Sequence, residues 1–332
     1  MATKKFAGPS PYVINTTYPE VDFRHTEYIN NATAKKSRTS AAPVVAAIFG
    51  LGRAGSIHLS SIIRNPRIIL KYIVDDRPEI FTELKSYWKL EDQVVCLTSK
   101  NADRVYKDKS SASTITSVHG ERGADESVWH REQDASSTSC QRFIDDLQQV
   151  ATLRGGVFHD CVVHDFDIAC WILGELPVRV HATASGLITE VKAIDDFDNI
   201  AFLLTYPSGT VAIGDNSRFC AYGYDQRLEV FGNKGMIKVE NEKPAHSLES
   251  YIGQDGIKLN PIYYSFPSRY KIAYRRELEH FLDVVQYGVP IEVSSWQTLA
   301  ISKIATAAEE SARTGKTVEL DWSKDGIPAE YS

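Results

Sequence analysis

The sequence lacks the features that mark membrane proteins and nucleic-acid binders. Among its 332 residues, no apolar run approaches the roughly 20 residues that a helix needs to cross a bilayer. Basic residues are not in excess: the formal net charge is −6, whereas a general binder of nucleic acid or of a membrane surface shows a positive balance. We therefore expect no nucleic-acid partner and no membrane association. The apolar fraction of 43% is normal for a folded chain with a sizeable core.

Paired cysteines and metal-ligand spacings are also missing. The five cysteines form no C-x-x-C pair: Cys96, Cys140, Cys161, Cys170 and Cys220. Their odd number fits reduced thiols better than a disulfide framework, and no group of histidines or cysteines has zinc spacing. The N-terminal region has no apolar segment of the signal-peptide kind, and its acidic residues are atypical of a transit peptide. We expect a cytoplasmic protein that holds no metal.

The chain changes character along its length. Residues 1–42 are polar and predict a tail that is ordered only where something docks it. Residues 43–150 begin with apolar runs separated by helical patterns, and residues 151–322 contain strand candidates followed by long helices. We therefore expect a tail, a dinucleotide-binding domain and a domain for substrate binding and oligomerisation, and the length allows two domains of ordinary size.

The first domain is predicted from alternating strands and helices. Strands are expected at 44–49, 68–74 and 93–97, and helices at 56–64, 78–88 and 101–107. Short apolar runs of this kind are typical of strands buried on both faces. The order β-α-β-α-β-α is the first half of a doubly wound parallel sheet, so we expect an α/β, Rossmann-type domain.

This order breaks down between residues 110 and 141. The segment has few apolar residues and shows no sustained period of 2 or 3.6. The fourth to sixth strands of a dinucleotide-binding fold are expected to begin here. We interpret the segment as disordered or degraded and the first domain as incomplete, with a helix resuming at 142–150.

The second domain is predicted to be α+β. After a helix at 159–173, strand candidates lie at 178–184, 200–206, 210–213, 228–231 and 236–239. Turn sequences rich in glycine separate several of them. Two long helical patterns follow at 270–287 and 295–314, and Gly315 closes the second. The expected layout is an antiparallel sheet with helices on one side.

A glycine-rich turn joins the first predicted strand to the first helix. Its six residues follow the pattern G-x-G-x-x-G: Gly50, Leu51, Gly52, Arg53, Ala54 and Gly55. The pattern alone is weak, but here it follows a buried strand, and Asp75 lies 25 residues beyond Gly50 at the end of the next strand. In this setting the glycines let the backbone approach a pyrophosphate, and the start of the helix offers N–H groups to the phosphates.

Asp75 indicates which dinucleotide is expected. An acidic side chain at this place accepts hydrogen bonds from the ribose hydroxyls and disfavours a 2′-phosphate, so NAD is expected rather than NADP. Asp76 is an alternative acceptor at the same strand end. The alternative to the whole site is a glycine turn in an α/β protein that binds no ligand.

Acidic and imidazole side chains gather on one predicted helix. Asp160, His164 and Asp167 fall at positions i, i+4 and i+7, which share a helical face. Two carboxylates and an imidazole amid apolar neighbours are costly unless they are solvated or used. A histidine beside a carboxylate can take a proton from an alcohol as a hydride leaves. The alternative is that Asp160 caps the helix and the others are ordinary polar residues.

The glycine turn with Asp75, together with the sequence GGVFHDCVVHDFDIACWILGE at 155–175, resembles the Gfo/Idh/MocA oxidoreductase family. Within the family the likeness is greatest to the inositol 2-dehydrogenase branch. The sequences GNKGMIKVEN at 232–241 and FPSRYKIAYRRELEHFLD at 266–283 are similar to that branch as well. The likeness covers 44–108 and 142–320 and leaves out the tail and the middle.

The resemblance implies an NAD-dependent dehydrogenase that oxidises a secondary alcohol of a cyclic polyol or sugar, with myo-inositol as the leading candidate. It implies that His164 and Asp160 are catalytic, with His164 as the proton acceptor, and that Asp167 lies near the polyol. It also implies that the antiparallel sheet forms an interface between copies of the chain, so a homo-dimer or tetramer is expected.

The sequence departs from the family in a way that bears on catalysis. The family has an E-K-P motif after the fifth strand of the first domain, and its lysine completes the catalytic set. The Glu-Lys-Pro found here, at 242–244, follows a predicted strand of the second domain, and we interpret it as a coincidence. By the same resemblance, the segment between Asn101 and Gly155 is roughly 50 residues too short for three strands and their helices.

Two other hypotheses therefore stand beside an active inositol dehydrogenase. One is a catalytically inactive family member or truncated isoform that acts through binding or mixed oligomers. Ending the sheet after its third strand would leave residues 44–49 as an unpaired apolar edge, keeping the adenosine half of the site but not the lysine. The other keeps the activity and changes the polyol or sugar, because pocket shape decides the substrate.

Overall fold

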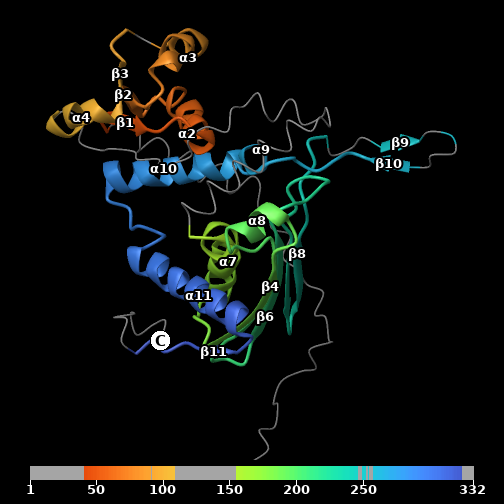
Figure 1. Ribbon diagram of the computed structural model, residues 1–332. Coiled ribbons are helices and arrows are strands. Elements are labelled where there is room, and N and C mark those ends of the chain that lie inside the picture. The colour runs from red at the N-terminus through yellow and green to blue at the C-terminus, as the bar shows by residue number, and fades with distance from the viewer. Residues whose placement is uncertain are drawn as a thin grey trace, which may run out of the picture.

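The chain forms two lobes, each built around its own sheet (Figure 1). The computed structural model describes residues 41–90, 92–108, 155–245, 249–251, 253 and 257–323. The predicted tail and the irregular segment at 110–141, with the helix predicted after it, lie outside these residues.

The first lobe is a three-stranded parallel sheet with helices packed beside it. Its strands are β1 (Val44–Phe49), β2 (Ile68–Val74) and β3 (Val95–Leu97), hydrogen-bonded in the order β1-β2-β3. Its helices are α2 (Arg53–Ile62), η1 (Pro78–Ile80), α3 (Phe81–Trp88), η2 (Ser99–Asn101) and α4 (Asp103–Lys107). The predicted β-α-β-α-β-α order is confirmed, although α2 begins three residues earlier than predicted, directly within the glycine turn.

The first strand is buried on both faces, as its unbroken apolar run predicts. Ile48 packs into a cluster with Leu59 of α2, whereas Ala47 faces a second cluster that contains Val105 of α4. Within the described residues, β2 is the one strand that pairs with β1. The segment expected to lie on the other side of β1, or to leave it as an open edge, is outside the described part of the chain.

The second lobe is an antiparallel sheet covered by helices on one face. Strands β4 (Arg179–Ser185), β5 (Asn199–Thr205), β6 (Val211–Ser217) and β11 (Val318–Glu319) pair in the order β11-β4-β5-β6, and β7 (Leu228–Gly232) pairs with β8 (Gly235–Val239). Helices α7 (Val163–Leu173) and α11 (Ser295–Thr314) pack on the sheet. Alternate residues of β5 point into this core, including Phe202, whose ring meets that of Phe166 at 4.9 Å. The predicted α+β layout is confirmed.

Several short elements of the second lobe were not predicted. They are α8 (Thr189–Ala193), the hairpin of β9 (Glu249–Tyr251) and β10 (Ile257–Leu259), α9 (Phe266–Arg269) and the edge strand β11. Each has five residues or fewer, too short to show a hydrophobic period. The β9–β10 hairpin projects away from both lobes in Figure 1.

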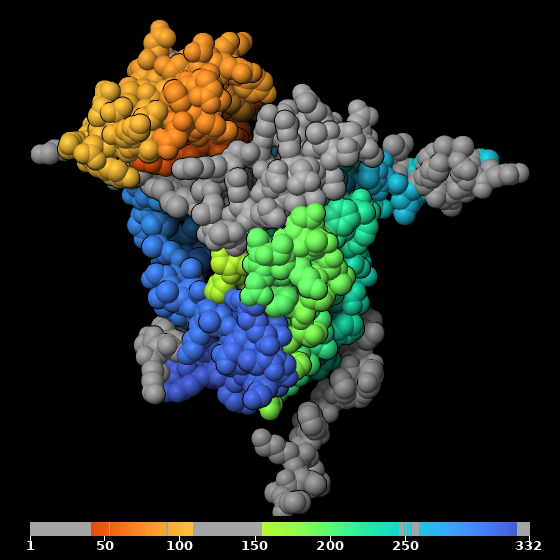
Figure 2. Space-filling model, viewed as in Figure 1, coloured from red at the N-terminus to blue at the C-terminus, as the bar shows by residue number. Residues whose placement is uncertain are grey.

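Helix α10 (Lys271–Tyr287) follows the second sheet in sequence but packs on the first lobe. Leu278 and Leu282 join the cluster formed by β1 and α2. Arg67, which precedes β2, donates hydrogen bonds to Glu279 at 2.6 Å and to Asp283 at 2.7 Å. In Figure 2 the blue C-terminal residues extend from beneath the first lobe to the second. The core of the first lobe is therefore completed by a helix that the sequence pattern assigns to the second domain.

Candidate functional site

The glycine turn brings the start of α2 against the end of β1. Gly50 adopts a φ of +78°, and its N–H donates to the carbonyl of Val74 at 2.8 Å. A Cβ atom on Gly55 would lie 1.9 Å from the carbonyl oxygen of Gly50, so this position admits glycine alone. Gly52 is the N-cap of α2, which has no side-chain cap and no acidic residue in its first turn. The turn therefore presents backbone N–H groups that no carboxylate of the first turn competes for.

Asp75 lies directly against this turn. Its Oδ2 accepts a hydrogen bond from the N–H of Leu51 at 2.7 Å, and its side chain is almost fully buried. Burial by itself would raise the pKa of Asp75, but hydrogen bonds from Arg77 and Leu51 outweigh it, so that the pKa lies below its ordinary value. Asp76 instead accepts from the N–H of Ser99 at 2.8 Å. Of the two acids considered from the sequence, Asp75 is the one in contact with the glycine turn.

The helix predicted at 159–173 does not begin as a regular α-helix. Its first turn, η3 (Phe158–Val162), is a π-helix, and α7 follows it. A π turn holds more residues than an α turn, so positions 160, 164 and 167 do not follow one α-helical repeat. Asp160 is mostly buried, whereas His164 and Asp167 are exposed. The prediction of a single α-helical face through these three residues is wrong for that first turn.

A buried arginine holds Asp160 in place. Arg218, at the end of β6, lies 3.1 Å from the carboxylate of Asp160 and 2.9 Å from that of Asp196, and its side chain is 3% exposed. Asp196 in turn accepts the N–H of Val157 at 3.1 Å, where the chain enters the π turn. Asp196 therefore does what the sequence-based alternative assigned to Asp160: it satisfies a backbone N–H at the start of the helix.

A second carboxylate, the half-buried Asp165, lies next to His164 in the sequence. It accepts hydrogen bonds from Asn216 of β6 and from Gln226, both at 3.3 Å. Burial raises its pKa, and the hydrogen bonds and the neighbouring His164 oppose that rise. The hydroxyl of Tyr270 donates to the side-chain oxygen of Gln226. Asp165 thus lies in a polar network that links α7, β6 and the start of α10.

Aromatic rings connect this network to the first lobe. The ring of Tyr270 lies 5.8 Å from that of Tyr224, and Tyr224 lies 6.4 Å from Phe266. Phe266 is 6.5 Å from Tyr274, whose ring meets the imidazole of His58 on α2 at 5.4 Å. Edge-on and tilted contacts of this kind add to the energy of burying the rings. They place the helix of the glycine turn in continuous contact with the polar network around Asp165.

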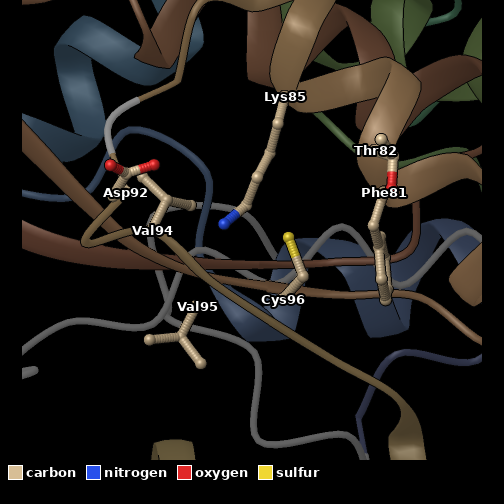
Figure 3. A pocket seen from close by; sticks show the side chains of 7 residues that line it. All are labelled: Phe81, Thr82, Lys85, Asp92, Val94, Val95 and Cys96. Atoms are coloured by element: carbon tan, nitrogen blue, oxygen red, sulfur yellow. The ribbon is translucent and has the colours of Figure 1, made fainter.

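A hollow of about 430 Å³ lies elsewhere, between α3 and β3 (Figure 3). It is lined by Phe81, Thr82, Lys85, Asp92, Val94, Val95 and Cys96. Asp92 and Val94 precede β3, so the hollow opens away from the carboxyl ends of the strands, where dinucleotides bind in such sheets. We therefore do not assign it to the candidate site.

Neither a metal cluster nor a membrane span is found in the described ranges. There, no three His, Cys, Asp or Glu side chains are placed to hold a metal ion. No helix in that part of the chain is both long and apolar enough to cross a bilayer. The four cysteines it contains are free thiols.

Residues 129–238 match the family described as the GFO/IDH/MocA C-terminal domain. This stretch includes the π turn, His164, the strand β6 that carries Asn216, and Arg218 just after that strand. Over these residues the chain is similar to the Gfo/Idh/MocA family. The resemblance seen in the sequence is therefore confirmed.

Relatives of the chain carry related names. It is 40% identical to inositol 2-dehydrogenase of Rhizobium meliloti (strain 1021) over 167 residues, which cover 50% of this chain and 50% of that protein. It is 27% identical to the uncharacterised oxidoreductase YrbE of Bacillus subtilis (strain 168) over 336 positions, covering 84% of this chain and 97% of YrbE. The match of higher identity, to inositol 2-dehydrogenase, thus spans about half the length of that relative.

A solved structure supports the assignment of the fold. Myo-inositol dehydrogenase from Corynebacterium glutamicum ATCC 13032 superposes with a TM-score of 0.68 at 24% identity, covering 84% of this chain and 99% of that one. The expected fold, a Rossmann-type domain followed by an α+β domain with an antiparallel sheet, is therefore confirmed. The integrity of the first domain depends on residues 109–154, which are not among those described.

Four side chains in or beside the site were not predicted from the sequence: Arg77, Asp165, Asp196 and Arg218. Arg77 and Asp165 each directly follow an acid or a histidine that was identified, so proximity in sequence was an available signal. Asp196 and Arg218 approach Asp160 from 36 and 58 residues away. The hydrophobic period within one segment does not predict contacts between residues so far apart in the sequence.

Proposed function

We propose that the chain is an NAD-dependent oxidoreductase that acts on a secondary alcohol of a cyclic polyol or sugar, with myo-inositol as the first substrate to test. One observation carries the proposal: a buried carboxylate, Asp75, is bound to the glycine turn at the end of β1. The name of the 40% identical relative, inositol 2-dehydrogenase, indicates the class of substrate.

The glycine turn has the features that a dinucleotide needs. Gly50 provides the left-handed backbone conformation, Gly55 the close approach of helix and strand, and Gly52 an N-cap without a side chain. The six residues from Gly50 to Gly55 would hold the pyrophosphate, and Asp75 would face the ribose. When bound, NAD supplies the hydride acceptor for oxidation of an alcohol.

The second lobe supplies the acid–base groups. His164 is exposed and takes the hydroxyl proton. Asp160, fixed by Arg218, orients the hydroxyl, and Asp167 binds the polyol from the following turn.

An alternative proposal is a catalytically inactive chain that acts through binding or mixed oligomers. It rests on the missing E-K-P lysine: the Glu-Lys-Pro at 242–244 follows β8, and Glu242 forms an ion pair with Arg269 at 3.2 Å. The alignment with YrbE runs over 336 positions yet includes 84% of 332 residues, so YrbE has residues that this chain lacks. Co-purification with an intact homologue, without NADH formation by this chain itself, would support this alternative.

Exposed apolar side chains on three strands of the second lobe support a homo-oligomer. Ile213 of β6, Phe231 of β7 and Ile237 of β8 are each more than 70% exposed. Large apolar side chains exposed to this extent are typical of protein interfaces when they form a patch. We propose that a second copy covers them in a dimer or tetramer, and a light-scattering mass equal to one chain would contradict this.

The variant His164→Ala tests the proposed activity. We expect it to reduce the rate of NADH formation from myo-inositol by about 10²-fold or more, because general-base catalysis contributes that much, while NADH binding is retained. His181→Ala, at an exposed position of β4, is the matched control and should leave the rate unchanged. Full activity of His164→Ala would refute the role given to His164.

A further inference from the structure

The Asp75 carboxylate has no free hydrogen-bond acceptor position for a ribose hydroxyl. Its Oδ1 accepts from the backbone N–H of Arg77 at 3.0 Å and from Nε of the same residue at 2.9 Å. Its Oδ2 accepts from the N–H of Leu51 at 2.7 Å and from Nη2 of Arg77 at 3.2 Å. A carboxylate offers about four lone-pair positions, and these donors fill them all. A ribose hydroxyl can bind Asp75 only after one of these donors has left.

The donor that can leave is the guanidinium of Arg77. The other two donors are backbone N–H groups, and one of them belongs to the buried Leu51 of the glycine turn. The side chain of Arg77 is 36% exposed, whereas that of Asp75 is 7% exposed. Departure of the guanidinium would free one position on each carboxylate oxygen. Two freed positions match the two neighbouring hydroxyls of a ribose that carries no phosphate.

The same guanidinium, left in place, suits a different ligand. It pairs with the charge of Asp75, and its Nη2 also donates to the carbonyl of Leu51 at 3.0 Å, so it is held at the edge of the glycine turn. A planar guanidinium is well matched to phosphate, with which it forms charge-assisted hydrogen bonds. A 2′-phosphate arriving here would meet a cation in front of the carboxylate rather than the carboxylate alone.

We propose that Arg77 sets the choice between NAD and NADP and allows the chain to bind both. Swung away, it leaves Asp75 to the two ribose hydroxyls of NAD. Kept in place, it neutralises Asp75 and receives the 2′-phosphate of NADP. This inference rests on the proposed function in one respect, that the glycine turn binds a dinucleotide. Asp75 alone predicts a strong preference for NAD. With Arg77 beside it, we expect the chain to bind NADP as well.

The test is a set of fluorescence titrations of the full chain with NADH and with NADPH. In Arg77→Gln, which removes the charge but keeps much of the side-chain length, we expect the ratio of the NADPH Kd to the NADH Kd to rise about tenfold or more, because a charge-assisted contact to phosphate is lost. In Asp75→Asn we expect the ratio to fall. Arg64→Gln, an exposed arginine just beyond α2, is the control for the change of net charge and should leave the ratio as in the wild type.

The outcomes separate this inference from the proposed function. A ratio in Arg77→Gln within twofold of the wild type, with NADH still bound, overturns the role of Arg77 and leaves the dehydrogenase proposal standing. The expected shift in ratio, in a chain that oxidises no polyol, supports Arg77 and overturns the dehydrogenase proposal. Failure of the wild-type chain to bind either nucleotide overturns both.

Discussion

Each lobe contains an aspartate held by an arginine. The two pairs differ in how deeply the arginine is buried and in how far apart the partners lie in the sequence. In the first lobe, Arg77 binds Asp75 from two residues away, and its side chain is 36% exposed. In the second, Arg218 binds Asp160 from 58 residues away and also binds Asp196, and its side chain is 3% exposed. The first pair is local in sequence and partly solvated, whereas the second joins β6, the π turn and the loop before β5.

This difference suits what each aspartate is proposed to do. Asp75 has to exchange a protein donor for a ligand hydroxyl, so its partner must be able to move into water. Asp160 has to hold one position beside a substrate hydroxyl, so its partner gains from being immobile and shielded. The strength of an ion pair rises steeply as solvent is excluded, and so does the penalty for breaking one partner away.

The largest effect that would sharpen this comparison is expected from Arg218→Met. Removing the cation leaves the carboxylates of Asp160 and Asp196 buried and uncompensated, so we expect the free energy of unfolding to fall by about 3–5 kcal/mol. Arg218→Lys should recover part of this loss, because a lysine retains the charge but not the fork that reaches both carboxylates. Urea denaturation provides the measurement.

The control for this prediction lies in the same sheet, on β4. Arg179 of β4 is exposed, and Arg179→Met should change stability by no more than about 0.5 kcal/mol. Equal losses in Arg218→Met and Arg179→Met would show that the buried pair does not hold the second lobe together.

A smaller effect is expected from Arg77→Gln on stability. Because the pKa of Asp75 is lowered in the folded chain, the ionised carboxylate stabilises the fold above its unfolded pKa, and this contribution is lost as the pH falls through the folded value. Without Arg77 the pKa of Asp75 should move up, so that less stability is lost as the pH falls below the unfolded pKa of about 3.9. Because the pair is partly solvated, the difference should stay below about 1 kcal/mol. Acid titration of the free energy of unfolding measures it, and an effect as large as that of Arg218→Met would contradict the comparison.

The difference between local and long-range contacts also explains which features can be predicted from the sequence. The strand–turn–helix unit around Gly50 and the strand that ends at Asp75 are predicted correctly, because burial, turn and helix start are all encoded within a few residues. Helix α11 has the predicted span for the same reason: Ser294 and Gln297 form a reciprocal cap at its start, and Gly315 adopts a φ of +70° at its end.

Non-local contacts explain what the sequence does not reveal. At the π turn, Arg218 and Asp196 contact Asp160 and the N–H of Val157, and no pattern within 155–167 predicts these contacts. The packing of α10 on the first lobe depends on its apolar face meeting α2 after the chain has passed through a whole second sheet. Hydrophobic period predicts that α10 is a helix with a buried face, but not which core that face completes.

The most direct test of the central claim is a titration of the purified full chain with NADH, followed by fluorescence with and without myo-inositol. We predict saturable binding of NADH and a change in its fluorescence or affinity when myo-inositol is added, because the glycine turn and the helix that carries His164 are linked through the rings from His58 to Tyr270. No binding of NADH at any accessible concentration would contradict the account, because the turn at Gly50 and Asp75 would then not form a dinucleotide site.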